Sequence, residues 1–221
     1  MTVHLGPLTV EAEDPAAVTR FWEAALGEAA CRRHLVIRPQ RQPKVVKNRV
    51  HLDVYVGDVA SLLALGARVL AEYLPLGRIT LADVEGNEFC AFLDPDRSEG
   101  EPAAEAFAVC TDSDRPEELA AWWAPLLGAE IGPGPDGTMR WLTGGGVWPD
   151  LIWKFVRVHD ERLREESTTG DERVVPNRWQ WSVTAGVEEL VGAGASAAGD
   201  AVLVDPDGNE VSAPGPVSSG G

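Results

Sequence analysis

The segment Val50–Val56 alternates apolar and polar residues, which is the pattern of a half-buried β-strand. His51, Asp53 and Tyr55 then share one face of that strand. A carboxylate beside an imidazole can orient it, and a phenol can donate a proton or line a pocket. We therefore take Asp53 and Tyr55 as candidate catalytic residues next to His51. Each also has a structural interpretation: a hydrogen-bonded core histidine, a solvated carboxylate and a pocket wall.

Two glutamates, Glu88 and Glu210, each stand directly after a Gly-Asn pair that is typical of a tight hairpin turn. A carboxylate at the start of a strand can reach a binding site on the sheet. It can equally accept hydrogen bonds from the backbone N–H groups of its own turn. Both interpretations stay open for both glutamates.

Tryptophans concentrate in the second half of the chain, and Trp141, Trp148 and Trp153 lie around the glycine run 144–146. We expect these three to line a binding cleft, whereas the tryptophans on predicted helices and on the strand near residue 180 pack helix against sheet. Aromatic walls in an acidic protein suit a flat or cationic organic ligand. The glycine run is no phosphate loop, because no Lys-Ser/Thr pair follows it.

The chain repeats itself, which indicates the elements that must position these residues. Four blocks of the first half recur in the same order in the second half. Phe21-Trp22 and Leu26-Gly27 correspond to Trp122-Trp123 and Leu127-Gly128. Residues 48–54 correspond to 177–183, residues 58–67 to 187–195, and residues 81–88 to 203–210. The chain is therefore predicted to be a duplication. We place the first domain at 1–97, a linker at 98–104, the second domain at 105–213 and a flexible tail at 214–221.

Each half divides again into a short strand, a helix and several hairpin strands. Asp14 and Pro15 begin the first helix as N-cap and first-turn proline, and Gly27 ends it. Pro125 should kink the corresponding helix of the second half or end it early. The pattern predicts an α+β fold of four βαβββ modules, in which each half of the chain forms its own open cup.

Residues 43–53 and 83–90 resemble the glyoxalase-like group of the vicinal oxygen chelate superfamily, which includes bleomycin-binding proteins and extradiol dioxygenases. The resemblance spans residues 1–95 and continues more weakly over 105–213. It implies two tandem βαβββ modules curled into an open eight-stranded cup. It also implies a divalent metal at the floor of the cup, where vicinal oxygens of the substrate bind.

Carried over position by position, the resemblance makes His51 and Glu88 metal ligands, and such a pair suits iron, manganese, zinc or nickel. Where the family has a third ligand, this sequence has Pro7 in the first half and Ala108 in the second. His4 lies at an odd offset from Pro7 and is expected on the opposite face of the strand. In the second half Gln180 replaces the histidine and Glu210 remains.

Composition limits the partners. The formal net charge is −16, from 35 acidic and 19 basic residues, which disfavours nucleic acid and leaves a small organic molecule, with cations attracted to the acidic surface. No secretory signal or membrane-spanning run occurs, so no membrane partner is expected. The three cysteines, Cys31, Cys90 and Cys110, share no metal-ligand spacing and suit a reducing cytoplasm. A monomer or a homodimer fits equally well.

Three functions follow from these patterns. The first is a metal-dependent lyase, isomerase or dioxygenase working through His51 and Glu88. The second is a metal-free protein that sequesters a drug or metabolite, as bleomycin-resistance proteins do, with Gln180, Ser182 and Glu210 as binding groups of the second half. The third is a scaffold without activity.

Overall fold

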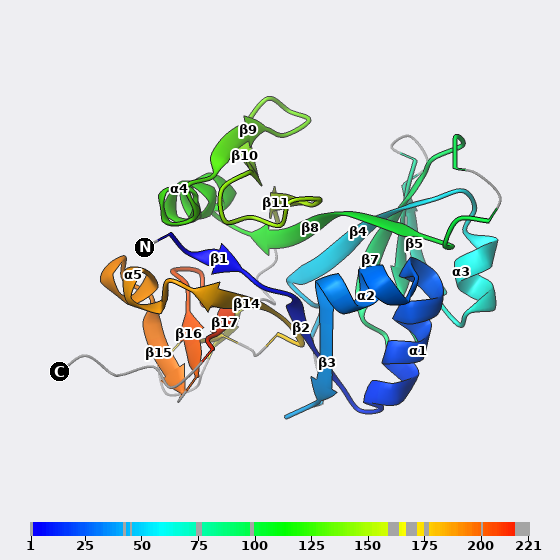
Figure 1. The fold of residues 1–221 in the computed structure, drawn as a ribbon, viewed down its shortest axis with the longest axis horizontal. Helices are drawn as coiled ribbons and strands as arrows, with labels where there is room; N and C mark the ends of the chain where they lie inside the picture. The colour runs from blue at the N-terminus through cyan, green and yellow to red at the C-terminus, as the bar shows by residue number, and fades with distance from the viewer. Residues whose placement is uncertain are drawn as a thin grey trace.

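The structure is a computed structural model that describes residues 2–41, 43–44, 46–73, 77–97, 100–158, 164–166, 172–174, 177–199 and 201–214. Of the tail expected at 214–221, only the first residue lies within these ranges. Figure 1 shows two lobes, with most of the first half of the chain in blue to cyan on the right and the second half in green to red on the left. None of the described helices has the length and apolar character needed to cross a membrane.

The first sheet has eight strands in the order β5-β6-β7-β4-β8-β11-β10-β9. Their bounds are β4 (Val50–Val56), β5 (Arg68–Tyr73), β6 (Arg78–Ala82), β7 (Glu88–Leu93), β8 (Glu105–Ser113), β9 (Glu130–Pro133), β10 (Met139–Thr143) and β11 (Ile152–Arg157). The strands β4 and β8 pair antiparallel at the centre, and each has the last strand of its own module parallel beside it. Helix α3 (Ala60–Ala64) belongs to one of these modules and α4 (Pro116–Leu127) to the other.

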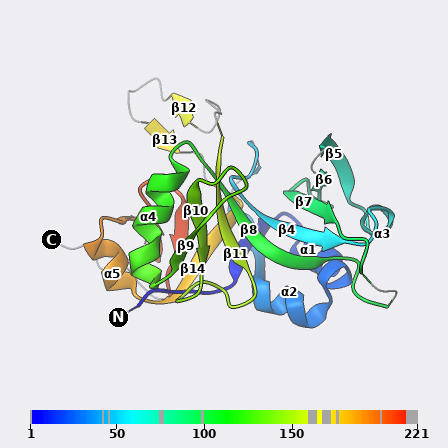
Figure 2. The ribbon, with the colours of Figure 1, turned by 90° about the horizontal axis from the view of Figure 1, so that it is seen from above.

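The second sheet contains seven strands among the described residues, in the order β15-β16-β17-β14-β2-β3, with β1 on β14. Their bounds are β1 (His4–Leu5), β2 (Leu8–Ala12), β3 (Leu35–Pro39), β14 (Trp179–Ala185), β15 (Ser196–Gly199), β16 (Val202–Val204) and β17 (Glu210–Ser212). The helices of these modules are α1 (Pro15–Leu26), α2 (Glu28–His34) and α5 (Val187–Gly192). A separate hairpin, β12 (Arg164–Glu166) with β13 (Glu172–Val174), projects beyond both sheets in Figure 2.

The first module departs from the predicted βαβββ pattern. Its last strand, β3, lies parallel to β2, just as β7 lies parallel to β4 and β11 to β8. The two intervening strands are replaced by α2, so this module is βααβ and the second sheet has fewer strands than expected. The reason is local, because residues 28–34 read Glu-Ala-Ala-Cys-Arg-Arg-His, with helix formers and no alternation of apolar residues.

The prediction that each half forms its own cup is wrong. One sheet joins the second and third modules through β4 and β8, and the other joins the first and fourth through β2 and β14. The two ends of the chain are then left to close the second sheet. Each cup therefore takes strands from both lobes (Figures 1 and 2).

Buried tryptophans fill the space between the helices and the sheets. In the first lobe Trp22 of α1 packs against Phe89, and its Nε1 donates to Asp83 at 3.3 Å. The second lobe repeats the arrangement, with Trp123 Nε1 donating to Asp205 at 3.4 Å. The duplication seen in the sequence is thus retained in the core. Pro125 lies inside α4, but α4 has 12 residues, as α1 does, and ends at the equivalent Leu127, so the expected early end does not occur.

Candidate ligand and metal site

The concave face of the first sheet holds a cavity of about 690 Å³, lined by side chains of both modules. His51 and Asp53 of β4 both line it, so they share a face, as the alternation of that strand predicted. Both are buried, which the alternation did not predict for this polar face. His51 Nε2 is 3.3 Å from Asp53 Oδ1. The predicted pairing of an imidazole with a neighbouring carboxylate is therefore present in the structure.

Two cysteines flank this pair, one on each neighbouring strand. In the strand registers Cys90 of β7 lies opposite Asp53, and Cys110 of β8 lies opposite His51. Side chains at paired positions share a face, and both thiols line the cavity. Cysteine spacing along the chain had given no sign of a metal site, because the two cysteines are brought together with His51 only by the sheet.

Two groups of side chains in this cavity can hold a metal ion, and both contain His51. One group adds Asp53 and Cys90, the other Cys110 and Asp112, and in each group the ligand atoms lie within 4.8 Å of one another. His51 Nδ1 is buried without a hydrogen-bond partner among the described residues, and the contact of Asp53 Oδ1 with His51 Nε2 at 3.3 Å lacks hydrogen-bond geometry. Buried polar atoms are rarely left unpaired, so the residues present fit a cation at this position.

Burial and neighbouring charges act in opposite directions on His51. Burial lowers the pKa of its imidazole, but the contacts with Cys110 and the Asp53 carboxylate outweigh burial and raise that pKa well above its usual value. Burial raises the pKa of Cys110 to about 11. A metal bound here would have to displace protons from these groups.

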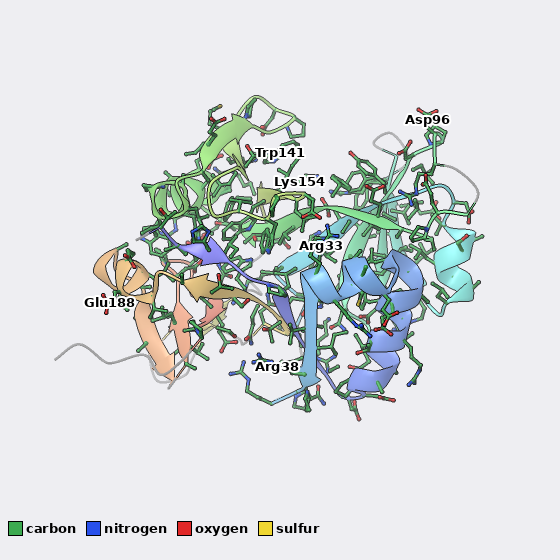
Figure 3. The ribbon with its side chains drawn as sticks, in the orientation of Figure 1. Arg33, Arg38, Asp96, Trp141, Lys154 and Glu188 are labelled. Atoms are coloured by element: carbon green, nitrogen blue, oxygen red, sulfur yellow. The ribbon has the colours of Figure 1, made fainter. Side chains whose placement is uncertain are left out.

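Lys154 of β11 is the residue at this site that the sequence analysis missed. Its ammonium group is 3.1 Å from Asp53 Oδ2 and lies over the ring of Phe107 at 4.1 Å, with the rings of Trp141 and Phe92 at 5.1 and 5.3 Å. Figure 3 shows Lys154 and Trp141 close together above the sheet. A signal was available, because this lysine interrupts the apolar run 151–156.

Two of the three lysines of the chain line this cavity, and the third contacts one of the carboxylates that line it. Besides Lys154, Lys47 is hydrogen-bonded to Asp112, and Lys44 Nζ is 2.7 Å from Glu88. Each carboxylate that lines the cavity therefore has an ammonium group beside it.

The predicted metal ligand Glu88 has other partners. Its carboxylate is ion-paired with Lys44 and accepts a hydrogen bond from the backbone N–H of Asn48 at 3.1 Å. Glu88 lines the cavity but belongs to neither group that can hold a metal. The structure thus gives His51 the partners Asp53 and Cys90 in place of the expected Glu88.

The structure separates the other residues that the sequence analysis proposed for a site, Tyr55 from the first half of the chain and three tryptophans from the second. Tyr55 is 37% exposed and stacks on Phe107, with ring centroids 3.9 Å apart, outside the cavity lining. Trp141 does line the cavity. Trp148 and Trp153 do not line it, because both are buried in the core, where their indole N–H groups are hydrogen-bonded. Their predicted position in a binding cleft is wrong.

A second cavity, of about 530 Å³, lies on the other sheet and is lined by Gln180 and Ser182, among others. Glu210 accepts hydrogen bonds from Gln180 and from Arg41, and Arg41 also pairs with Glu11. The candidate binding residues of the second half are therefore together, although two of them are engaged with each other.

Because the modules pair across the halves, the expected third-ligand position of each half lies in the cup that holds the other half's candidate glutamate. Pro7 lines the second cavity, whereas Ala108 lies on β8 of the first sheet, paired with Asp53. His4 of β1 pairs with Ala185 of β14 and lines neither cavity. Pro7 therefore does not share a cavity with Glu88, and Ala108 does not share one with Glu210.

Comparisons with known proteins agree with this architecture. A family model for the glyoxalase-like domain matches residues 7–92 and 108–213. Glyoxalase I from Zea mays is similar with a TM-score of 0.54 at 12% identity, over 96% of this chain and 92% of that one. A putative dioxygenase from Bacillus subtilis subsp. subtilis str. 168 gives a TM-score of 0.54 at 10% identity, over 96% and 85% of the two chains. A search of curated proteins finds no match.

Paired βαβββ modules around open cups define a protein of the vicinal oxygen chelate fold, as the sequence predicted. The family model covers most of the chain in two copies, so this protein belongs to the glyoxalase-like domain family. At these identities the structural likeness shows the fold alone, and an activity must be argued from the site itself.

Proposed function

We propose that this protein binds a small organic molecule in the first cavity and acts on it with a divalent metal held by His51, Asp53 and Cys90. The observation that carries the proposal is the convergence of one nitrogen, one oxygen and one sulfur ligand on the floor of a concave sheet. A cavity of this size with a few convergent polar groups is typical of a small-molecule site.

The proposed ligands suit iron, zinc or nickel, whereas manganese prefers more oxygen ligands. Such a metal would supply Lewis-acid polarisation of a ligand oxygen. The protein's own residues hold the site in place, because Lys154 binds one oxygen of Asp53 and leaves the other facing His51. The solved structures with this fold, a glyoxalase I and a putative dioxygenase, favour a lyase, isomerase or dioxygenase activity.

Metal analysis of the untagged protein, combined with calorimetric titration of zinc and ferrous iron, tests the proposal. Cys90→Ser should weaken metal binding by about tenfold or more, and His51→Ala should abolish it. The matched control is Cys31→Ser, which removes an equally buried thiol on α2, away from both metal groups. Metal affinity that is unchanged in both Cys90→Ser and His51→Ala would contradict the proposed site.

A metal-free binding protein is the second candidate, and one observation favours it. Asp53 and Asp112, one carboxylate in each metal group, already have lysine partners in Lys154 and Lys47. In that case ligand binding in the first cavity should persist in the presence of a chelator. For either function we propose a cytoplasmic protein, because its three cysteines are free and buried. We propose a monomer or a homodimer for both.

A further inference from the structure

The lining of the first cavity is basic, although the protein as a whole is strongly acidic. Five basic residues line it, Lys47, Arg78, Arg140, Lys154 and Arg157, against three carboxylates. The chain carries 35 acidic and 19 basic residues in all. A concentration of cations in one concave site raises the local concentration of anions and repels cations.

Arg78 of β6 is the cation whose charge is least compensated. Its guanidinium lies 4.3 Å from the ring centroid of Tyr73, and no described carboxylate is within ion-pair distance. Its Nε is buried without a hydrogen-bond partner among the described residues. By contrast, Arg140 pairs with Asp136 and Arg157 with Glu117. A half-buried guanidinium with unused donors is suited to a carboxylate that arrives with a ligand.

Arg78 and Lys154 approach the cavity next to the same aromatic side chain. Arg78 lies opposite Phe92 in the register of β6 with β7, and the Lys154 ammonium lies 5.3 Å from the Phe92 ring. Lys154 has three N–H donors, and the described contacts give it a single carboxylate partner. Trp141, Phe89 and Phe92 supply flat apolar surface in the same cavity.

We infer that the first cavity takes a small organic anion, an aromatic or conjugated carboxylate, whose carboxylate group is bound by Arg78 and Lys154. This inference rests on the proposed function and names its ligand class. It keeps the expectation of a flat ligand and replaces the cationic alternative, which followed from aromatic residues in a protein of negative net charge. The net charge averages over a surface whose acidic groups lie mainly outside the cavity.

Three probes of equal shape and different charge test the inference: cinnamate, cinnamamide and cinnamylamine, each titrated calorimetrically into the full chain. Cinnamate should bind at least about tenfold more tightly than the other two, because only a carboxylate gains a charge-assisted hydrogen bond. Arg78→Gln should weaken cinnamate binding by about tenfold and leave cinnamamide unchanged. Arg78→Lys, which keeps the charge but loses the forked donors, should fall between them.

Arg68→Gln is the matched control, because Arg68 lies exposed on the neighbouring strand β5 and does not line the cavity. It should leave the binding of all three probes unchanged, and thermal unfolding should show that each variant folds. Preference for cinnamylamine, or an equal loss of cinnamate and cinnamamide in Arg78→Gln, would overturn the inference. Absence of binding by all three probes would overturn it too. The separate metal titration then decides whether the proposed function survives.

Discussion

The ammonium group of Lys154 lies 3.1 Å from Asp53 Oδ2, although the two residues are 101 positions apart and come from different halves of the duplicated chain. Both side chains are almost fully buried. This contact joins the β4 and β11 modules across the floor of the first cavity. The same ion pair therefore stabilises the cup and positions Asp53, a proposed metal ligand.

Replacing Lys154 with methionine should lower the free energy of unfolding by about 3 kcal/mol, because it leaves the Asp53 carboxylate buried without its cationic partner. The measurement is urea unfolding at neutral pH. The double variant Asp53→Asn/Lys154→Met should recover much of the loss, since it buries no unpaired charge. If the single and double variants were equally stable, the ion pair would have no structural importance.

Substituting a buried tryptophan should mainly lower stability, whereas substituting the tryptophan that lines the cavity should mainly weaken ligand binding. Trp153→Ala should cost about 3–5 kcal/mol of stability, because its fully buried ring packs against several other tryptophans. Trp141→Ala should cost much less, since Trp141 is only partly buried, yet it should weaken the binding of cinnamate. Thermal unfolding and calorimetry measure the two effects. A larger loss of stability for Trp141→Ala would contradict this division.

The pH dependence of stability should contain a contribution from Asp205. Burial raises the pKa of this carboxyl from 3.8 to about 6 in the folded protein. Between these two values the folded state retains a proton that the unfolded state has lost, so stability falls as the pH rises. The stability of the wild type relative to Asp205→Asn should therefore fall by up to about 3 kcal/mol over this interval.

Urea unfolding of both proteins at several pH values measures this difference. Asp96→Asn, at an exposed turn, is the control and should follow the wild type at every pH. Parallel curves for the wild type and Asp205→Asn would show that Asp205 does not titrate with a raised pKa.

The pairing of modules across the halves predicts that neither half folds alone. A fragment of residues 1–97 would leave β4 without β8 and β2 without β14, exposing the unpaired backbone N–H and C=O groups of both strands as sheet edges. We expect this fragment to be unfolded or aggregated by circular dichroism and gel filtration. Co-expression with 98–221 should restore a folded complex. A stable, monomeric 1–97 fragment would contradict the observed topology.

Local sequence patterns determined much of the fold. The alternation of Val50–Val56 predicted that His51 and Asp53 share a face, because side chains of a strand point to opposite sides in turn. The repeated Gly-Asn-Glu turns and tryptophan-bearing helices predicted the duplication and the modules. These features depend on residues that are neighbours in the chain, so they can be seen in the sequence. The family resemblance was confirmed on the same blocks.

The partners of His51 were decided only by the tertiary structure. Strand registers bring Cys90 and Cys110 to His51 and bring Lys154 to Asp53. A register depends on the packing of whole modules rather than on spacing along the chain. Glu88 had the right residue type but lies beside Lys44, which the sequence could not place there. Which modules share a cup, and therefore which side chains share a cavity, was fixed by the antiparallel contact of β4 with β8, where strands from both halves bury their apolar faces together.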